Sequence, residues 1–221
     1  MAATEHLSGG SLNAFVDERV NSARHVRISP DHTSPELQGR VVPRGKFFHL
    51  DGERFLIKGV TYGTFGPDAE GYQFPALTQV AEDFAQMRAH GINTVRAYTI
   101  PSLAMLDAAA RAGLRVMVGM PWAQHVAFLH DPVLSRTIRA EIRQTIKSLA
   151  DHPSVLMFAL GNEMPGEIER WPGRERVQAF IRTLYDDAKS VAPESTLTYV
   201  NFPPTEFLEV PFLYVGGFNV Y

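Results

Sequence analysis

Apolar and polar residues alternate in blocks along the chain, and each block has the period of one kind of secondary structure. Apolar residues recur at spacings of three and four in four stretches, which predicts helices around residues 77–87, 102–110, 132–149 and 177–188. Short apolar runs predict buried strands near residues 55–62, 92–98, 114–122, 154–160, 196–202 and 212–221. Six strands that alternate with helices indicate a parallel sheet, and therefore an α/β fold.

Turn and capping residues mark the ends of these elements. Asp51-Gly52 separates Lys46–Leu50 from Glu53–Ile57 and suits the two positive φ angles of a tight turn, so an N-terminal β-hairpin is expected. Gly91 and Gly113 each end a predicted helix, and Asp131-Pro132 supplies an N-cap with proline in the first turn. The segments HGINTVR and AGLRVMV therefore predict two tight connections of the same kind, each from a helix to the next strand.

Doubly wound sheets and (β/α)8 barrels share this alternation. The sequence contains neither G-x-G-x-x-G after the first strand nor G-x-x-x-x-G-K-[ST], which argues against a nucleotide-binding sheet. We therefore predict a (β/α)8 TIM barrel that is incomplete, with about six βα units. The length agrees, because 221 residues are fewer than the roughly 250 of a complete barrel.

Composition limits the class of protein. Residues 1–40 lack a sustained period and are expected to form a flexible tail or linker, so that 41–221 form the partial barrel. A net charge of −3 and a pI near 6.2 give no basic footprint, and nucleic acid is not an expected partner. We find no apolar run of 18 residues and no leader segment, so no membrane contact is expected and the cytoplasm is the default location. The absence of cysteine excludes disulfides and thiolate metal sites.

The strongest functional signal is Leu160-Gly161-Asn162-Glu163, which closes the apolar run Ser154–Leu160. In barrels of parallel strands, catalytic residues lie at the carboxyl ends of the strands. The motif thus places an amide and a carboxylate side by side at a catalytic position. A helix-capping asparagine beside a solvated glutamate is the simpler interpretation of these four residues.

Together with the hairpin, Lys58-Gly-Val-Thr-Tyr-Gly63, Arg96 and Tyr221, this motif resembles the clan of retaining glycoside hydrolases with (β/α)8 barrels, of the family 2 and family 5 type. The resemblance covers residues 44–221. It implies that Glu163 is the catalytic acid/base, that Asn162 binds sugar, and that Arg96 and Tyr221 lie beside the nucleophile. That nucleophile is a glutamate at the end of a seventh strand, which this sequence does not contain, so the chain alone is expected to be inactive.

Aromatic residues end several predicted strands, and flat rings stack on the C–H faces of sugars. We predict that Tyr62, Tyr98, Trp122 and Tyr221 bind substrate. His125 and His130 lack the i, i+4 spacing of a zinc pair, so neither a metal nor another cofactor is expected.

The first functional hypothesis is a retaining glycosidase acting on β-linked glycosides or oligosaccharides. The alternative is a non-catalytic carbohydrate-binding or regulatory barrel of a larger polysaccharide-handling protein, and a carboxylate on a seventh strand would discriminate the two. An aldolase-like lyase would need a Schiff-base lysine, and no lysine lies inside a predicted strand after Lys58. The first and sixth strands would be open edges, so self-association through them is a further expectation.

Overall fold

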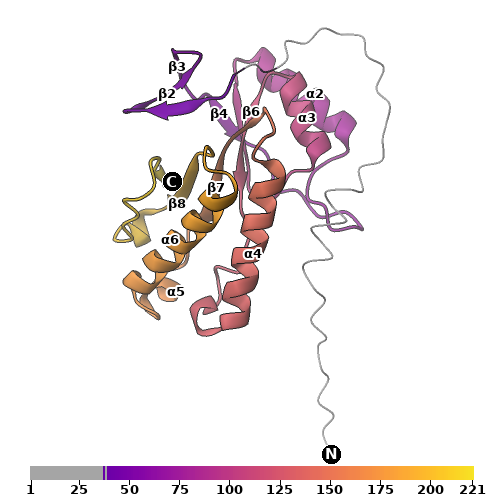
Figure 1. Ribbon diagram of the computed structural model, residues 1–221. Coiled ribbons are helices and arrows are strands. Elements are labelled where there is room, and N and C mark those ends of the chain that lie inside the picture. Colours follow the sequence, from indigo (N-terminus) through magenta and orange to yellow (C-terminus); the bar gives the residue numbers. More distant parts are fainter. Residues whose placement is uncertain (1–36, 38) are drawn as a thin grey trace, which may run out of the picture.

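The computed structural model describes residues 37 and 39–221, and most of the expected N-terminal tail lies outside these residues. The described elements comprise a small antiparallel sheet and a larger parallel sheet with its helices (Figure 1). The antiparallel strands are β1 (Val42–Arg44), β2 (Phe47–Leu50) and β3 (Glu53–Phe55). Asp51 and Gly52 connect β2 to β3 with φ angles of 52° and 89°, which confirms the predicted turn and adds a third strand to the hairpin.

The parallel sheet follows the order of the sequence, as one wall of a barrel does. Its strands are β4 (Gly59–Thr61), β5 (Thr94–Ala97), β6 (Arg115–Gly119), β7 (Val155–Asn162), β8 (Leu197–Asn201) and β9 (Gly217–Phe218). Each pairs only with its neighbours in that list, all in parallel, which confirms an incomplete TIM barrel. Strands β4 and β9 end the order and leave two edges.

Helices alternate with these strands as the apolar periods predict. They are α2 (Leu77–Ala89), α3 (Leu103–Arg111), α4 (Pro132–Leu149), α5 (Gly166–Arg170) and α6 (Arg174–Val191), with the 3-10 turns η1 (Phe128–His130) and η2 (Pro203–Thr205). The backbone N–H groups of Val133 and Leu134 donate to Asp131 Oδ1 at 2.9 and 3.0 Å, which confirms the predicted N-cap of α4. Tertiary packing alone stabilises α5, since five residues are too few for an independent helix.

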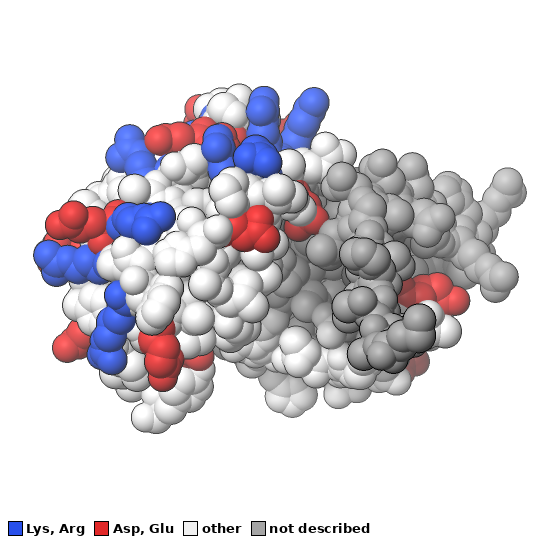
Figure 2. All heavy atoms as spheres, turned by 90° about the horizontal axis from the view of Figure 1, so that it is seen from below, with Lys and Arg blue, Asp and Glu red and all other residues white. Residues whose placement is uncertain are grey.

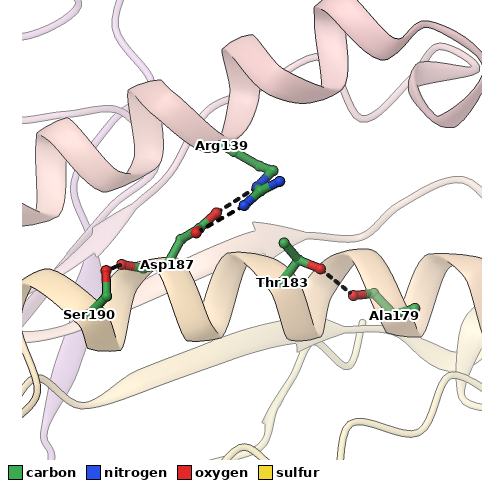
Figure 3. A network of polar contacts seen from close by, with 5 residues as sticks. All are labelled: Arg139, Ala179, Thr183, Asp187 and Ser190. Atoms are coloured by element: carbon green, nitrogen blue, oxygen red, sulfur yellow. Dashed lines mark hydrogen bonds and ion pairs between the residues drawn. The ribbon is translucent and has the colours of Figure 1, made fainter.

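The helices α4 and α6 lie side by side, and an ion pair joins their exposed sides (Figure 3). Arg139 donates to both carboxylate oxygens of Asp187, at 2.7 and 3.1 Å. An exposed pair of this kind stabilises the fold by at most about 1 kcal/mol. Most of the stabilisation comes instead from apolar residues on the inner faces, such as Ile138, Ile146, Val177 and Leu184, which are almost fully buried.

The small antiparallel sheet lies at the amino-terminal end of the barrel. Val41, Phe48 and Phe55 pack with Leu156 and Met157, which are near the start of β7. The antiparallel sheet therefore covers the end of the barrel at which the parallel strands begin. The carboxyl ends of β5 to β9 lie at the other end and remain open for a site.

One predicted strand is wrong in its extent. Only Gly217–Phe218 pair with β8, whereas residues 212–215 form turns. The ring of Phe212 packs against Tyr185 of α6, with 5.5 Å between the ring centroids. The apolar Phe212 in this segment is therefore explained by packing on a helix and not by a buried strand.

Candidate active site

Five side chains from three strands converge at the carboxyl ends of the parallel sheet. They are Arg96 in β5, Asn162 and Glu163 at the end of β7, and Asn219 and Tyr221 just after β9. These residues are up to 125 positions apart in the sequence, and only the parallel pairing of β5 to β9 brings them together.

Arg96 lies at the base of this cluster and is half-buried. One of its terminal nitrogens donates to Asn162 Oδ1 at 2.5 Å and the other donates to Asn219 Oδ1 at 2.9 Å. Its guanidinium carbon also lies 4.5 Å from the ring centroid of Tyr98, a cation-π distance. These contacts fix the cation, and they explain why a polar residue is tolerated between the buried Val95 and Ala97.

Asn219 joins the other members of the cluster. Its side-chain nitrogen donates to Asn162 Oδ1 at 3.1 Å and to Glu163 Oε1 at 2.5 Å. Its backbone N–H donates to the carbonyl of Asn201 in β8 at 2.8 Å, which anchors the segment after β9. Sequence reasoning missed Asn219, although it lies only two residues before Tyr221, which was predicted.

Glu163 adopts a backbone conformation that is uncommon for a residue with a side chain. Its φ is 48°, and its N–H donates to the carbonyl of Val200 at 2.8 Å. Successive residues of a regular strand point to opposite faces, yet Asn219 contacts both Asn162 and Glu163. The positive φ thus turns two adjacent side chains to the same side, at a cost of about 1–2 kcal/mol.

Tyr221 donates its hydroxyl hydrogen to Glu163 Oε1. This hydrogen bond raises the pKa of the phenol above its usual value, because the neutral phenol is the form that donates. Both Asn219 and Tyr221 therefore donate to the same oxygen of Glu163.

A second residue missed by sequence reasoning holds Asn162 by its backbone. Gln124, in the segment after β6, accepts from the N–H of Asn162 at 3.2 Å and donates to its carbonyl oxygen. Nothing in the sequence near Gln124 indicates this contact, since the residue lies in an irregular loop 38 positions away.

The predicted aromatic residues do not all reach the cluster. Tyr98 lies under Arg96, and Trp122 donates to the carbonyl of Leu160 at 2.7 Å while its ring packs against Phe128 and Phe180. Tyr62 lies outside the cluster: it is 5% exposed, and its hydroxyl donates to Asp83 Oδ2 of α2 at 2.6 Å. Its ring points into the helix layer because Phe84 and Phe74 offer apolar contacts there.

His125 is exposed, whereas His130 accepts a hydrogen bond from Trp171 at 3.3 Å. The described residues contain no group of three or more histidines and acids that could hold a metal ion. In the same part of the chain, no helix is both long and apolar enough to cross a membrane. Figure 2 views the molecule from the side of α5, and positive and negative side chains are interspersed on the described surface.

The fold and this cluster define a barrel domain of the glycosidase type. The chain belongs to family 2 of the glycosyl hydrolases, because the family model of the TIM-barrel domain matches residues 41–211.

The chain is also similar to individual proteins. A β-glucuronidase from Ruminococcus gnavus superposes with a TM-score of 0.69 at 18% identity, covering 82% of this chain and 31% of that one. β-Glucuronidase 2 from Bacteroides uniformis, covalently bound to cyclophellitol-6-carboxylate aziridine, gives 0.64 at 19% identity, covering 79% and 22%. The 1,3-beta-glucanosyltransferase GAS5 of Saccharomyces cerevisiae is 24% identical over 163 residues, covering 71% of this chain and 33% of that protein. The chain thus spans a third or less of the length of these relatives.

Proposed function

We propose that this chain contributes the acid/base side of the active site of a retaining glycosidase that acts on β-linked glycosides. The observation that carries the proposal is the hydrogen bonding of Glu163 at the carboxyl end of β7, where Asn219 and Tyr221 both donate to its Oε1. Both bonds leave Oε2 as the oxygen that transfers a proton to the leaving group. General acid catalysis requires a positioned carboxyl group of this kind.

The neighbours of Glu163 have complementary roles in this proposal. Asn162 is held through its side chain by Arg96 and through its backbone by Gln124. A rigid amide can donate to a sugar hydroxyl with a bond that strengthens in the oxocarbenium-like transition state. Arg96 makes no hydrogen bond or ion pair with a carboxylate of the described residues, so its positive charge is available to a second carboxylate.

Retention requires that second carboxylate, about 5–5.5 Å from the acid. Arg96 bonds Asn162 and Asn219 and no carboxylate in the part of the chain that the structure describes, so the proposal takes the nucleophile from residues outside that part. The Bacteroides uniformis relative is covalently bound to its aziridine, which supports a covalent intermediate in this family. The 221-residue chain by itself is expected to have negligible activity.

The relatives also suggest a substrate class. The names of the three relatives concern glucuronides and 1,3-β-glucan, and the sugars of both have the gluco configuration. We propose that the substrate is a β-linked, gluco-configured glycoside.

Substitution of Glu163 in the protein together with its nucleophile-bearing segment tests the proposal. Glu163→Ala should reduce kcat/KM by a factor of ~10²–10⁴ for alkyl β-glucosides and much less for β-glucosyl fluoride, whose leaving group needs no proton. Azide should restore turnover of activated substrates and give a β-glycosyl azide. Glu167→Ala, an exposed acid on the adjacent helix, is the control. Equal losses for both leaving groups would remove Glu163 from the acid role, and no turnover by the unmodified protein would favour the carbohydrate-binding alternative. Either result overturns the proposal.

A further inference from the structure

An exposed tryptophan follows the candidate active site in the sequence and has no role in it so far. Trp171 follows α5 and is 74% exposed. Single exposed apolar side chains are common on protein surfaces, so the contacts that hold the ring of Trp171 carry more weight than its exposure.

The ring of Trp171 is held in place. Its Nε1–H donates to His130 Nδ1 at 3.3 Å, and the centroids of the two rings are 6.4 Å apart. The edge of the ring borders an apolar hollow whose walls include Phe128 and Ile168. One side of the indole is fixed by these contacts, while most of the ring surface remains open to a ligand.

Trp171 and His130 come from loops on the active-site side of the barrel. His130 ends η1 in the connection after β6, and Trp171 lies eight residues after Glu163, at the far end of α5. Figure 1 shows α5 and the start of α4 at the same end of the molecule, opposite the β2–β3 hairpin. Asn219 and Tyr221, which follow β9, donate to Glu163, whereas Trp171 and His130 come from the connections that follow β7 and β6.

The surroundings of Trp171 suit the binding of a small ring better than the binding of another protein. Glu167, Arg170 and Arg174, which are near Trp171 in the sequence, are exposed and charged, so charged residues accompany the indole and the apolar hollow beside it. Protein interfaces bury larger apolar centres. A gluco-configured pyranose has equatorial hydroxyls and exposes two faces of C–H groups, which a flat indole can cover.

We infer that Trp171, oriented by His130, is a binding platform for a gluco-configured sugar ring on the leaving-group side of Glu163. This inference rests on the proposed function, because the general acid defines where the leaving group departs. It assigns Trp171 a contact with the substrate chain, and His130 a positioning role.

A comparison of two substrates tests this platform. Laminaripentaose places sugar rings on the leaving-group side, whereas β-glucosyl fluoride places none there. Trp171→Ala should lower kcat/KM for the pentasaccharide at least tenfold more than for the fluoride, mainly through KM. Trp171→Phe and His130→Ala should give intermediate values. Phe47→Ala, on the hairpin at the opposite end of the barrel, is the control for loss of an exposed aromatic ring.

Fluorescence separates failure of the platform from failure of the proposed function. Laminaripentaose should shift the tryptophan emission of the catalytically inactive Glu163→Gln protein, and Trp171→Phe in the same background should abolish that shift. A shift without any turnover by the unmodified protein would support the platform and contradict the glycosidase. Equal loss for both substrates would show that Trp171 only supports the loop of Glu163, and an unchanged emission would show that it binds no sugar. Either result overturns the inference.

Discussion

The side chain of Gln124 holds the backbone of Asn162 on both its N–H and its carbonyl group. The amide of Gln124 thus makes the two backbone hydrogen bonds that a neighbouring strand would otherwise make. It does so where the pairing of β7 with β8 shifts register. The end of β7 is therefore fixed by a loop residue as well as by the sheet.

Replacing Gln124 tests whether this contact positions the site. We expect Gln124→Leu to lose two hydrogen bonds, to reduce the free energy of unfolding by roughly 2 kcal/mol and to reduce kcat about tenfold or more. Urea unfolding of the chain, and steady-state kinetics of the protein together with its nucleophile-bearing segment, provide the measurements. Gln86→Leu on the exposed side of α2 is the control, and equal effects of the two substitutions would contradict a positioning role.

Gly161 lies immediately before Asn162, in a space too small for a side chain. A Cβ atom there would lie 2.8 Å from Cε2 of Tyr199 and 3.4 Å from Gln124 Oε1. Tyr199 is 1% exposed, so its ring has little room to move. Gly161→Ala should therefore destabilise the fold by about 1–3 kcal/mol. Thermal unfolding is the measurement, with Gly66→Ala, where the space is open, as the control. An unchanged midpoint for Gly161→Ala would show that the packing relaxes.

The buried carboxyl group of Glu169 should make the stability of the fold depend on pH. It is fully buried in α5, and neither carboxylate oxygen has a hydrogen-bond partner among the described residues. Burial raises its pKa from 4.5 to about 7, and the nearby Arg170 offsets part of the effect. Between these two values the folded protein keeps a proton that the unfolded chain has lost. Stability should therefore fall by up to roughly 3 kcal/mol as the pH rises through this window, and level off above it.

Urea midpoints at pH 5 and pH 8 measure this effect. Glu169→Gln should remove most of the decrease, whereas the matched change Glu167→Gln on the exposed side of α5 should retain it. A decrease of equal size in both variants would assign the effect to other groups.

The open edges of the sheet predict self-association of the 221-residue chain. All three residues of β4 are exposed, and Leu56, before this strand, is 62% exposed. Unpaired strands of this kind pair with other chains. Analytical ultracentrifugation should show oligomers that Val60→Lys reduces and Val133→Lys, on α4, does not. A monomer at high concentration would contradict the prediction.

The sequence alone determined the order and type of most elements. Periods of about 3.6 and short apolar runs report local burial, so they are sufficient to locate the long helices and the strands β4 to β8. Local chemistry was equally informative at the Asp51-Gly52 turn and at the Asp131 cap. The last predicted strand is too long because Phe212 is apolar for contact with α6, and burial against a helix gives the same signal as burial in a sheet.

The site was only partly encoded in this local pattern. Asn162 and Glu163 were visible because a polar pair ends a buried strand, and Arg96 because it interrupts one. Gln124 and Asn219 lie in irregular segments. Only the parallel pairing of β5 to β9 brings Gln124 to Asn162, and Asn219 to both Asn162 and Glu163. The position of Tyr62 outside this cluster could not be read from the pattern, because a residue at a strand end can face either the barrel or the helices. The tertiary structure decided that Tyr62 faces the helices. Its ring packs against Phe84 and its hydroxyl donates to Asp83, and the sequence near Tyr62 shows neither contact.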